Sequence, residues 1–188
     1  MTASSEPHVY VFADGSCASG QDAPGSWGAA VLTKQHTQLL FGALYPTTIS
    51  RCELYPVVES LRYIRDVLTP HRSLPVGFRV LLVSDSEYVV KTIGGLYEAS
   101  KNDDLWQAYH ALADKLDITA LHRGRNSHPL MCLVDSMAYA TYKEFGAYGE
   151  RLLSVTDLPS FDMIGLSPLR GTLDKHQLQE AQKETQQE

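Results

Sequence analysis

Residues 78–85 have the sequence FRVLLVSD, a nearly continuous apolar run that ends in a carboxylate. Apolar residues without polar alternation predict a strand that is buried on both faces. Residues 86–93 then have the pattern of a short helix, which Gly94 and Gly95 end. A buried strand followed at once by a helix is typical of an α/β fold with a central sheet. Asp85 is therefore predicted to lie at the end of the central strand, on the edge of the sheet.

The segments before this strand predict three more strands of the sheet and one helix. Three runs rich in β-forming residues predict an antiparallel meander: 9–13, 27–33 and 38–45. Residues 15–28 are rich in Gly, Ser and Pro and predict a loop. Helical spacing of apolar residues predicts a helix over 53–67. Its Pro56 must then lie in the first turn, because proline in a helix interior costs about 3 kcal/mol.

The segments after the central strand complete the pattern. They predict a helix over 105–116, a strand over 118–122 and a final helix over 131–145. We therefore expect an α/β fold with a five-stranded mixed sheet, whose first three strands are antiparallel, and with helices on both faces.

Composition divides the 188 residues into three parts. Residues 1–7 predict a flexible N-terminus, residues 8–149 hold all the predicted elements, and residues 150–188 predict a largely irregular or disordered tail. No apolar run approaches the roughly 20 residues of a membrane span, and residues 1–7 do not resemble a secretory signal. The three cysteines have no CxxC spacing, which indicates reduced thiols. We expect a monomeric, cytoplasmic protein with no membrane partner.

The net charge of −6 bears on possible partners. Residues 1–149 hold 12 basic and 15 acidic residues, and residues 150–188 hold 4 and 7. If four acids of the first part bind metal ions, its remaining charge is slightly positive. The acidic balance is therefore compatible with a nucleic-acid substrate, although it argues against binding through a large basic face.

Four acids fall at the ends of predicted elements. They are Asp14 after the first strand, Glu53 at the start of the first helix, Asp85 after the central strand and Asp135 in the first turn of the last helix. Clustered carboxylates suit Mg²⁺ or Mn²⁺. Two such ions about 4 Å apart can clamp the attacking and leaving oxygens of a phosphodiester. Each acid alone is better explained as a turn residue or a partner of a helix dipole, so the metal site is predicted only from the four together.

The same positions carry the motifs of a known family. The motifs are ADGSC (13–17) followed by WGAAVL (27–32), TTISRCEL (47–54), VSDSEYVV (83–90), KNDDLWQ (101–107) and HPLMCLVDSMA (128–138). In this order and spacing they resemble ribonuclease H of type 1, the fold shared by the bacterial enzymes and the nuclease domain of reverse transcriptases. The resemblance implies an RNase H-like catalytic domain over residues 8–149.

The resemblance also implies an activity: endonucleolytic hydrolysis of the RNA strand of an RNA–DNA hybrid with two divalent ions, Mg²⁺ or Mn²⁺. Asp14 would bridge both ions and Asp135 would serve the ion that activates the water. Glu53 and Asp85 would serve the ion on the leaving-group side. Glu53 would also lie near the 2′-hydroxyl that distinguishes RNA from DNA. Three further residues match positions that contact the backbone of the hybrid: Ser16, Cys17 and Ser50.

The sequence departs from the family in two places. The basic, Trp-containing insertion of the bacterial members is replaced by GGLYEAS at 94–100. Arg125 stands where the family has a loop histidine, and it cannot act as a general base because it stays protonated. Arg125 could instead bind a phosphate oxygen of the substrate. We predict that the proton role passes to His128 on the same loop; the alternatives are His122 at the end of a strand, or no histidine at all.

Two other functions remain open. One is another metal nuclease of the same superfamily, such as an exonuclease or an integrase-like enzyme, which the DGSC and SRCEL motifs disfavour. The other is a nucleic-acid-binding domain that has kept the fold but is catalytically weak. The displaced histidine and the acidic tail allow this second function, whereas the presence of all four acids argues against it.

Overall fold

The computed structural model describes residues 7–19, 23–34, 37–70 and 74–148. The predicted tail, 150–188, and residues 1–6 of the predicted N-terminal segment lie outside the described residues. Within the described ranges, no helix is both long enough and apolar enough to cross a membrane.

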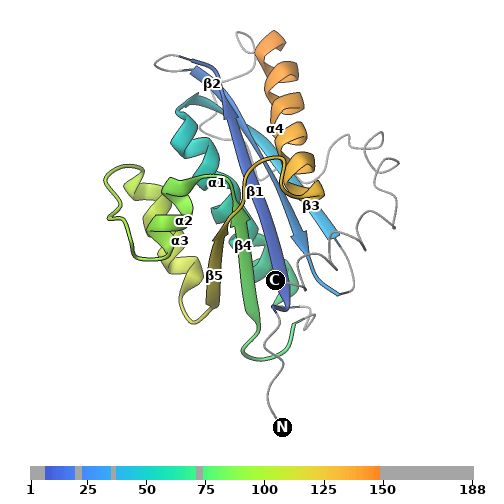
Figure 1. Ribbon diagram of the computed structural model, residues 1–188, viewed down its shortest axis with the longest axis vertical. Helices are drawn as coiled ribbons and strands as arrows, with labels where there is room; N and C mark the ends of the chain where they lie inside the picture. Colours follow the sequence, from blue (N-terminus) through green and yellow to red (C-terminus); the bar gives the residue numbers. More distant parts are fainter. Residues whose placement is uncertain (1–6, 20–22, 35–36, 71–73, 149–188) are drawn as a thin grey trace.

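Five strands form one mixed sheet in the order β3-β2-β1-β4-β5 (Figure 1). Their bounds are β1 Val9–Cys17, β2 Ala23–Leu32, β3 Thr37–Thr47, β4 Arg79–Ser84 and β5 Asp117–His122. β2 is antiparallel to both β1 and β3, whereas β4 runs parallel to both β1 and β5. The mixed sheet with three antiparallel strands at its start confirms the prediction from the sequence.

Helices cover both faces of this sheet, as expected. Their bounds are α1 Ile49–Tyr63, continued by the π-helical turn η1 Ile64–Leu68, then α2 Glu87–Ile93, α3 Asp103–Ala113 and α4 Pro129–Tyr148. α1 packs on one face with α3 against it, and α4 crosses the other face over β1 and β2 (Figure 1).

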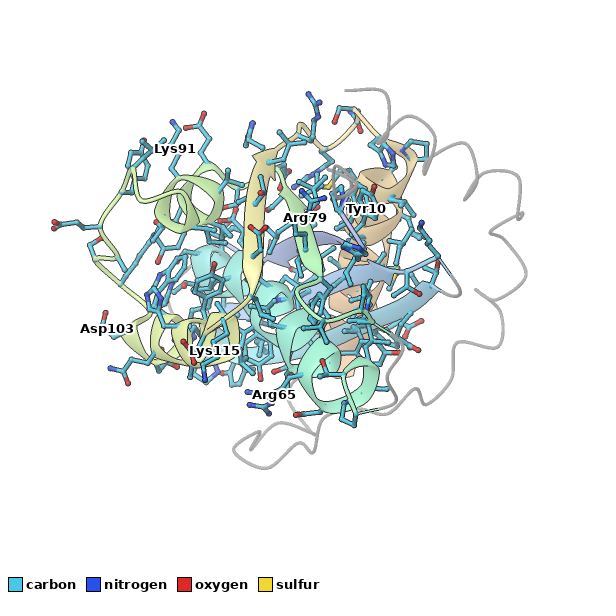
Figure 2. The ribbon with its side chains drawn as sticks, turned by 90° about the horizontal axis from the view of Figure 1, so that it is seen from below. Tyr10, Arg65, Arg79, Lys91, Asp103 and Lys115 are labelled. Atoms are coloured by element: carbon cyan, nitrogen blue, oxygen red, sulfur yellow. The ribbon has the colours of Figure 1, made fainter. Side chains whose placement is uncertain are left out.

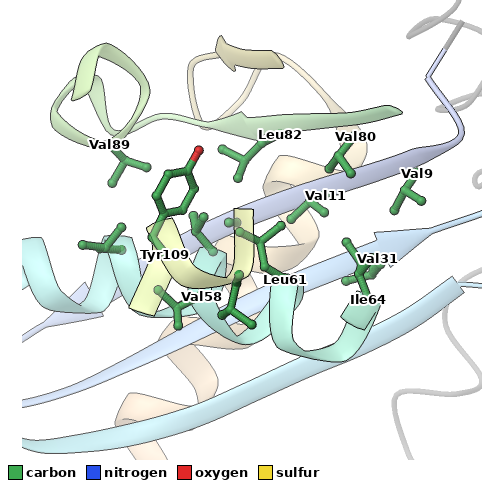
Figure 3. Close-up of a cluster of buried hydrophobic side chains, with 14 of the residues drawn as sticks. Val9, Val11, Val31, Val58, Leu61, Ile64, Val80, Leu82, Val89 and Tyr109 are labelled. Atoms are coloured by element: carbon green, nitrogen blue, oxygen red, sulfur yellow. The ribbon is translucent and has the colours of Figure 1, made fainter. Parts of the chain in front are cut away.

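Alternation along β1 gives each face its own hydrophobic core. Val11 points toward α1 and packs in one cluster with Leu61 of α1 and Leu82 of β4 (Figure 3). Phe12, the next residue, belongs to a second cluster with Met131 of α4. Because successive side chains of a strand point to opposite faces, β1 serves both cores and fixes where the two helix layers lie.

The segment 15–28, predicted as a loop, consists largely of strand, and that prediction was wrong. β1 continues to Cys17 and β2 begins at Ala23. The glycines here serve close packing instead of a turn. A Cβ on Gly28 would lie 2.7 Å from the carbonyl oxygen of Val134 in α4, and a Cβ on Gly15 would overlap the carbonyl group of Cys52 in α1. These two glycines let a helix approach the strand backbone on each face of the sheet.

Pro56 lies in the interior of α1, not in its first turn, because the helix begins at Ile49. The prediction placed the helix start four residues too late. Proline has no N–H to offer the carbonyl four residues earlier, which belongs to Cys52. That carbonyl is the group that approaches Gly15. The missing helical hydrogen bond therefore falls at the contact between α1 and β1, where packing in the core holds the helix in place.

Candidate active site

Three of the four predicted acids converge on one guanidinium group. The Nε of Arg125 lies 3.1 Å from Oδ1 of Asp135, 3.4 Å from Oδ2 of Asp85 and 3.6 Å from Oδ2 of Asp14. Asp14 lies on β1, Asp85 directly follows β4, and Asp135 lies on α4. Residues separated by more than 100 positions in the sequence therefore meet at a single point.

The parallel pairing of β1 with β4 brings the first two acids together. Ala13 pairs with Ser84 at the end of this register, so Asp14 and Asp85 occupy the next position on each chain. Asp85 follows its strand as predicted. Asp14, however, lies within β1, opposite Gly28 of β2, and does not end the strand.

The third acid arrives on α4. Because α4 begins at Pro129, Asp135 lies in the second turn, not in the first as predicted. Asp14 is two residues beyond Phe12 and points to the face of the sheet that α4 covers. Gly28 allows α4 to approach closely at Val134, the residue before Asp135. The packing of α4 on β2 thus positions Asp135 beside Asp14.

Glu53 reaches the cluster from the opposite face of the sheet. It lies in the second turn of α1, which also begins earlier than predicted. Its Oε2 accepts a hydrogen bond of 2.7 Å from the hydroxyl of Ser86, the residue after Asp85. The same hydroxyl accepts from the backbone N–H of Val89 and caps α2. Ser86 therefore joins Glu53 to the segment that carries Asp85. The sequence shows only that Ser86 follows Asp85 in the SDS motif and does not indicate its contact with Glu53.

The electrostatic environment of Asp14 is the most unfavourable of the cluster. Its side chain is 1% exposed, its Oδ1 accepts from the N–H of Gly15 at 2.7 Å, and its Oδ2 has no hydrogen-bond partner among the residues that the structure describes. Burial, and after it the charge of Asp85, raise the pKa of Asp14 from 3.8 to about 7. Burial also raises the pKa of Glu53, although the hydrogen bond from Ser86 opposes the rise. Bound cations would relieve this concentration of negative charge.

The donor set fits hard divalent ions, since it consists of carboxylate oxygens. In their present positions, no three His, Cys, Asp or Glu side chains among the described residues are grouped closely enough to hold one ion. The carboxylates instead surround the bulkier guanidinium of Arg125. Three of the four predicted metal ligands thus lie around a cationic side chain.

The two candidate histidines make structural contacts. The ring of His128 stacks on Phe12 with 4.8 Å between ring centroids, and its Nδ1 accepts from the backbone N–H of Leu130 in the first turn of α4. His128 is therefore the N-cap of α4. His122 ends β5, and its Nε2 lies 3.1 Å from the carbonyl oxygen of Asp85. Proton transfer by His128 stays a prediction.

The predicted substrate contacts lie beside the acids. Ser16 and Cys17 end β1, and Ser50 lies in the first turn of α1. The Ser50 side chain is buried and accepts a hydrogen bond of 3.3 Å from the side-chain amide of Asn102. Asn102 precedes α3 with a positive φ of 62°, a conformation that asparagine tolerates well. Asn102 belongs to the KNDDLWQ motif, but the sequence alone does not indicate that it is a neighbour of Ser50.

Comparison with known proteins identifies the family. The family model for RNase H matches residues 6–126. A ribonuclease H of Polynucleobacter asymbioticus is 34% identical over 157 residues, which cover 76% of this chain and 94% of that protein. A ribonuclease H of Cupriavidus metallidurans is 34% identical over 145 residues, which cover 69% of this chain and 92% of that protein.

Solved structures show the same fold. The crystal structure of LC11-RNase H1 in complex with an RNA/DNA hybrid has a TM-score of 0.59 at 16% identity, covering 72% of this chain and 97% of that one. The N-terminal RNase H domain of a Mycobacterium tuberculosis protein has a TM-score of 0.57 at 21% identity, covering 71% and 98%. The sequence matches, taken with the fold, show that this chain belongs to the ribonuclease H family.

Proposed function

We propose that this protein is an endonuclease that hydrolyses the RNA strand of RNA–DNA hybrids, with divalent ions held by Asp14, Glu53, Asp85 and Asp135. The observation that carries the proposal is the convergence of three of these carboxylates on one point, with the fourth tied to them through Ser86. Membership of the ribonuclease H family and a structural neighbour solved with an RNA/DNA hybrid support the same activity.

The ions are proposed to be Mg²⁺ or Mn²⁺, two to each site. When bound, they would supply an activated water and neutralise charge that develops on the phosphodiester. The protein's part is to hold the carboxylates rigidly. Asp14 is fixed within a strand at the centre of the sheet, and Asp135 is fixed by the packing of α4. A rigid backbone at both residues would limit the reorganisation needed for catalysis to side-chain movements.

Selection of the substrate is proposed to rest on residues next to the acids. The hydrogen bond from Ser86 holds the carboxylate of Glu53 in one orientation, so that it can meet a 2′-hydroxyl of the RNA strand. Ser16, Cys17 and Ser50 are proposed to contact the backbone of the hybrid, and Arg125 to contact a phosphate oxygen. We further propose that the protein acts as a monomer in the cytoplasm.

Cleavage assays with defined duplexes test this function. Labelled RNA–DNA hybrid, RNA–RNA and DNA–DNA duplexes are incubated with Mg²⁺, with Mn²⁺ and with EDTA. We expect internal cuts in the RNA strand of the hybrid alone, and only with a metal ion. Cutting of DNA–DNA would indicate another nuclease of the superfamily, and binding without cutting would indicate a catalytically weak binding domain.

Substitution of the acids tests the site itself. We expect Asp14→Asn and Asp85→Asn each to abolish cleavage while the circular dichroism spectrum stays that of the folded protein. Asp117→Asn is the matched control, since it removes an exposed carboxylate at the opposite end of β5 from His122. Cleavage at the wild-type rate by Asp14→Asn or Asp85→Asn would refute the assignment of the site.

A further inference from the structure

The contact of Arg125 with the acids differs from an ordinary arginine–carboxylate pair. Arg51 and Asp104 show the ordinary geometry, with two parallel hydrogen bonds of 2.8 and 2.7 Å. In the cluster, by contrast, a single Nε of Arg125 lies 3.1–3.6 Å from oxygens of three different carboxylates. One N–H group cannot donate well to three acceptors at once. Arg125 therefore acts here chiefly as a positive charge placed among negative ones.

We propose that Arg125 is the internal counter-ion of the carboxylate cluster in the metal-free protein, and that divalent ions displace it. The displaced guanidinium then becomes available to the phosphate groups of the nucleic acid. This inference rests on the proposed function, because it takes the cluster to be the metal site. It adds that metal ions and Arg125 compete for the same oxygens.

The surroundings of Arg125 suit such a displacement. Its side chain is 50% exposed, so that the guanidinium can leave toward solvent, whereas Asp14 is 1% exposed and cannot follow. The backbone of the loop is held at the same time. The carbonyl oxygen of Arg125 accepts from the thiol of Cys132 on α4, and Ser127 closes a turn onto Gly124. The movement therefore requires new side-chain torsions of one residue only.

Competition between metal ions and Arg125 for the carboxylate oxygens has two consequences. Arg125 lowers the apparent affinity for metal, because each ion must displace a favourable charge interaction. Conversely, metal binding frees Arg125 for phosphate, so metal and nucleic acid each strengthen the binding of the other. The guanidinium would thus offset the repulsion among the three aspartates in the metal-free protein, and it would help to make nucleic-acid binding conditional on bound metal.

Calorimetric titration with Mn²⁺ tests the competition. We expect Arg125→Gln to bind Mn²⁺ at least about fivefold more tightly than the wild type, while Arg125→Lys, which retains a positive charge, stays closer to the wild type. Arg65→Ala is the matched control, because it removes one exposed arginine, also paired with an aspartate, at the periphery of the molecule (Figure 2). We expect it to leave the affinity unchanged. Equal or weaker binding by Arg125→Gln would overturn the proposal.

A second measurement needs no destabilising substitution. In a ¹⁵N-labelled wild-type protein, the Nε–H signal of Arg125 is assigned by its absence from the spectrum of Arg125→Lys. We expect this signal to shift on titration with Mg²⁺ and to saturate together with metal binding. A signal that stays in place while the metal binds would refute displacement.

The Asp14→Asn variant separates failure of this inference from failure of the proposed function. If Asp14→Asn binds Mn²⁺ as the wild type does, the cluster is not the metal site, and both the function and the inference fail. If Asp14→Asn loses the metal but Arg125→Gln binds it no more tightly than the wild type, the metal site stands and only the competition is refuted.

Discussion

The folded protein disfavours the charged form of Asp14. The carboxylate is buried beside Asp85, and one of its oxygens has no hydrogen-bond partner. Its pKa is about 7 in the folded protein against 3.8 for the free side chain. Folding therefore favours the protonated form. The stability that this form contributes is complete below pH 3.8 and is lost as the pH rises through about 7.

Substitution of Asp14 should change how stability depends on pH. In EDTA, the wild-type protein should lose thermal stability between about pH 4 and pH 7, whereas Asp14→Asn should show a flatter profile. At pH 8 the variant should melt several degrees above the wild type, and the difference should shrink toward pH 4. Differential scanning calorimetry across this range measures both curves. A difference that is constant with pH would contradict the argument.

The sequence indicates the four candidate acids but not all of the residues that position them. A carboxylate after an apolar strand is visible in the residue order, as Asp85 is. Ser86 and Asn102 were missed because their importance depends on partners more than 30 positions away, Glu53 and Ser50. The contact of Arg125 with three acids was also beyond the sequence, because only the folded sheet and α4 bring them together.

At the scale of elements, the start of α4 depends on His128. Its Nδ1 accepts from the N–H of Leu130, and Pro129 occupies the first helical position, which suits proline. The ring stacks on Phe12, two residues before Asp14 on the same face of β1. His128 is thus placed both to cap a helix and to lie on the side of the sheet that carries the acids.

Two substitutions separate these roles. His128→Asn keeps an N-cap acceptor but removes the titratable ring, whereas His128→Ala removes both. We expect both variants to cleave about 10- to 100-fold more slowly, with little change in hybrid binding. Only His128→Ala should also lose about 1 kcal/mol of stability. Rates between pH 6 and 9 measure the effect on catalysis. An unchanged rate and profile in His128→Asn would leave the histidine as a cap alone.

Element types were easier to predict than element ends. The apolar run of β4 predicted a buried strand, and β4 does lie inside the sheet, but the central strand is β1, whose own apolar run is shorter. The Gly-rich ends of β1 and β2 predict a loop from the sequence, since glycine marks turns more often than close packing. Pro56 moved the predicted start of α1 toward the C-terminus, because the sequence does not reveal that packing on Gly15 offsets the cost of an interior proline.

At the scale of the whole molecule, the charge on the surface is modest. The segment 94–100 between α2 and α3 contains no Lys or Arg, and Lys91 and Lys101 on either side lie over the rings of Tyr97 and Tyr88. Lys91 and Asp103 mark this region in Figure 2. Few phosphates can therefore be neutralised there, and the net charge of −6 opposes long-range attraction of nucleic acid.

Binding should accordingly depend weakly on salt. The Asp85→Asn variant, which we expect to be inactive, would allow hybrid affinity to be measured without cleavage at a series of KCl concentrations. We expect the plot of log K against log salt to be shallower than the slope of about −5 to −9 that 6–10 phosphate contacts would give. A slope in that range would contradict this prediction, because it would indicate that about 6–10 phosphates are neutralised by a basic surface despite the negative net charge.

The parallel pairing of β1 with β4 also bears on how the chain reaches its native state. The two strands meet across a long separation, as His8 and Arg79 do at 71 positions apart. Until β4 arrives, the first hairpin offers β1 as an open edge on which the strand of another molecule could add. Such non-local closure is slow in folding, and unpaired edges favour aggregation. Asp14 lies on β1 one residue beyond the pairing with β4, so the charge proposed for metal binding also places an inward-pointing carboxylate on the open strand, a feature that opposes pairing with a wrong partner.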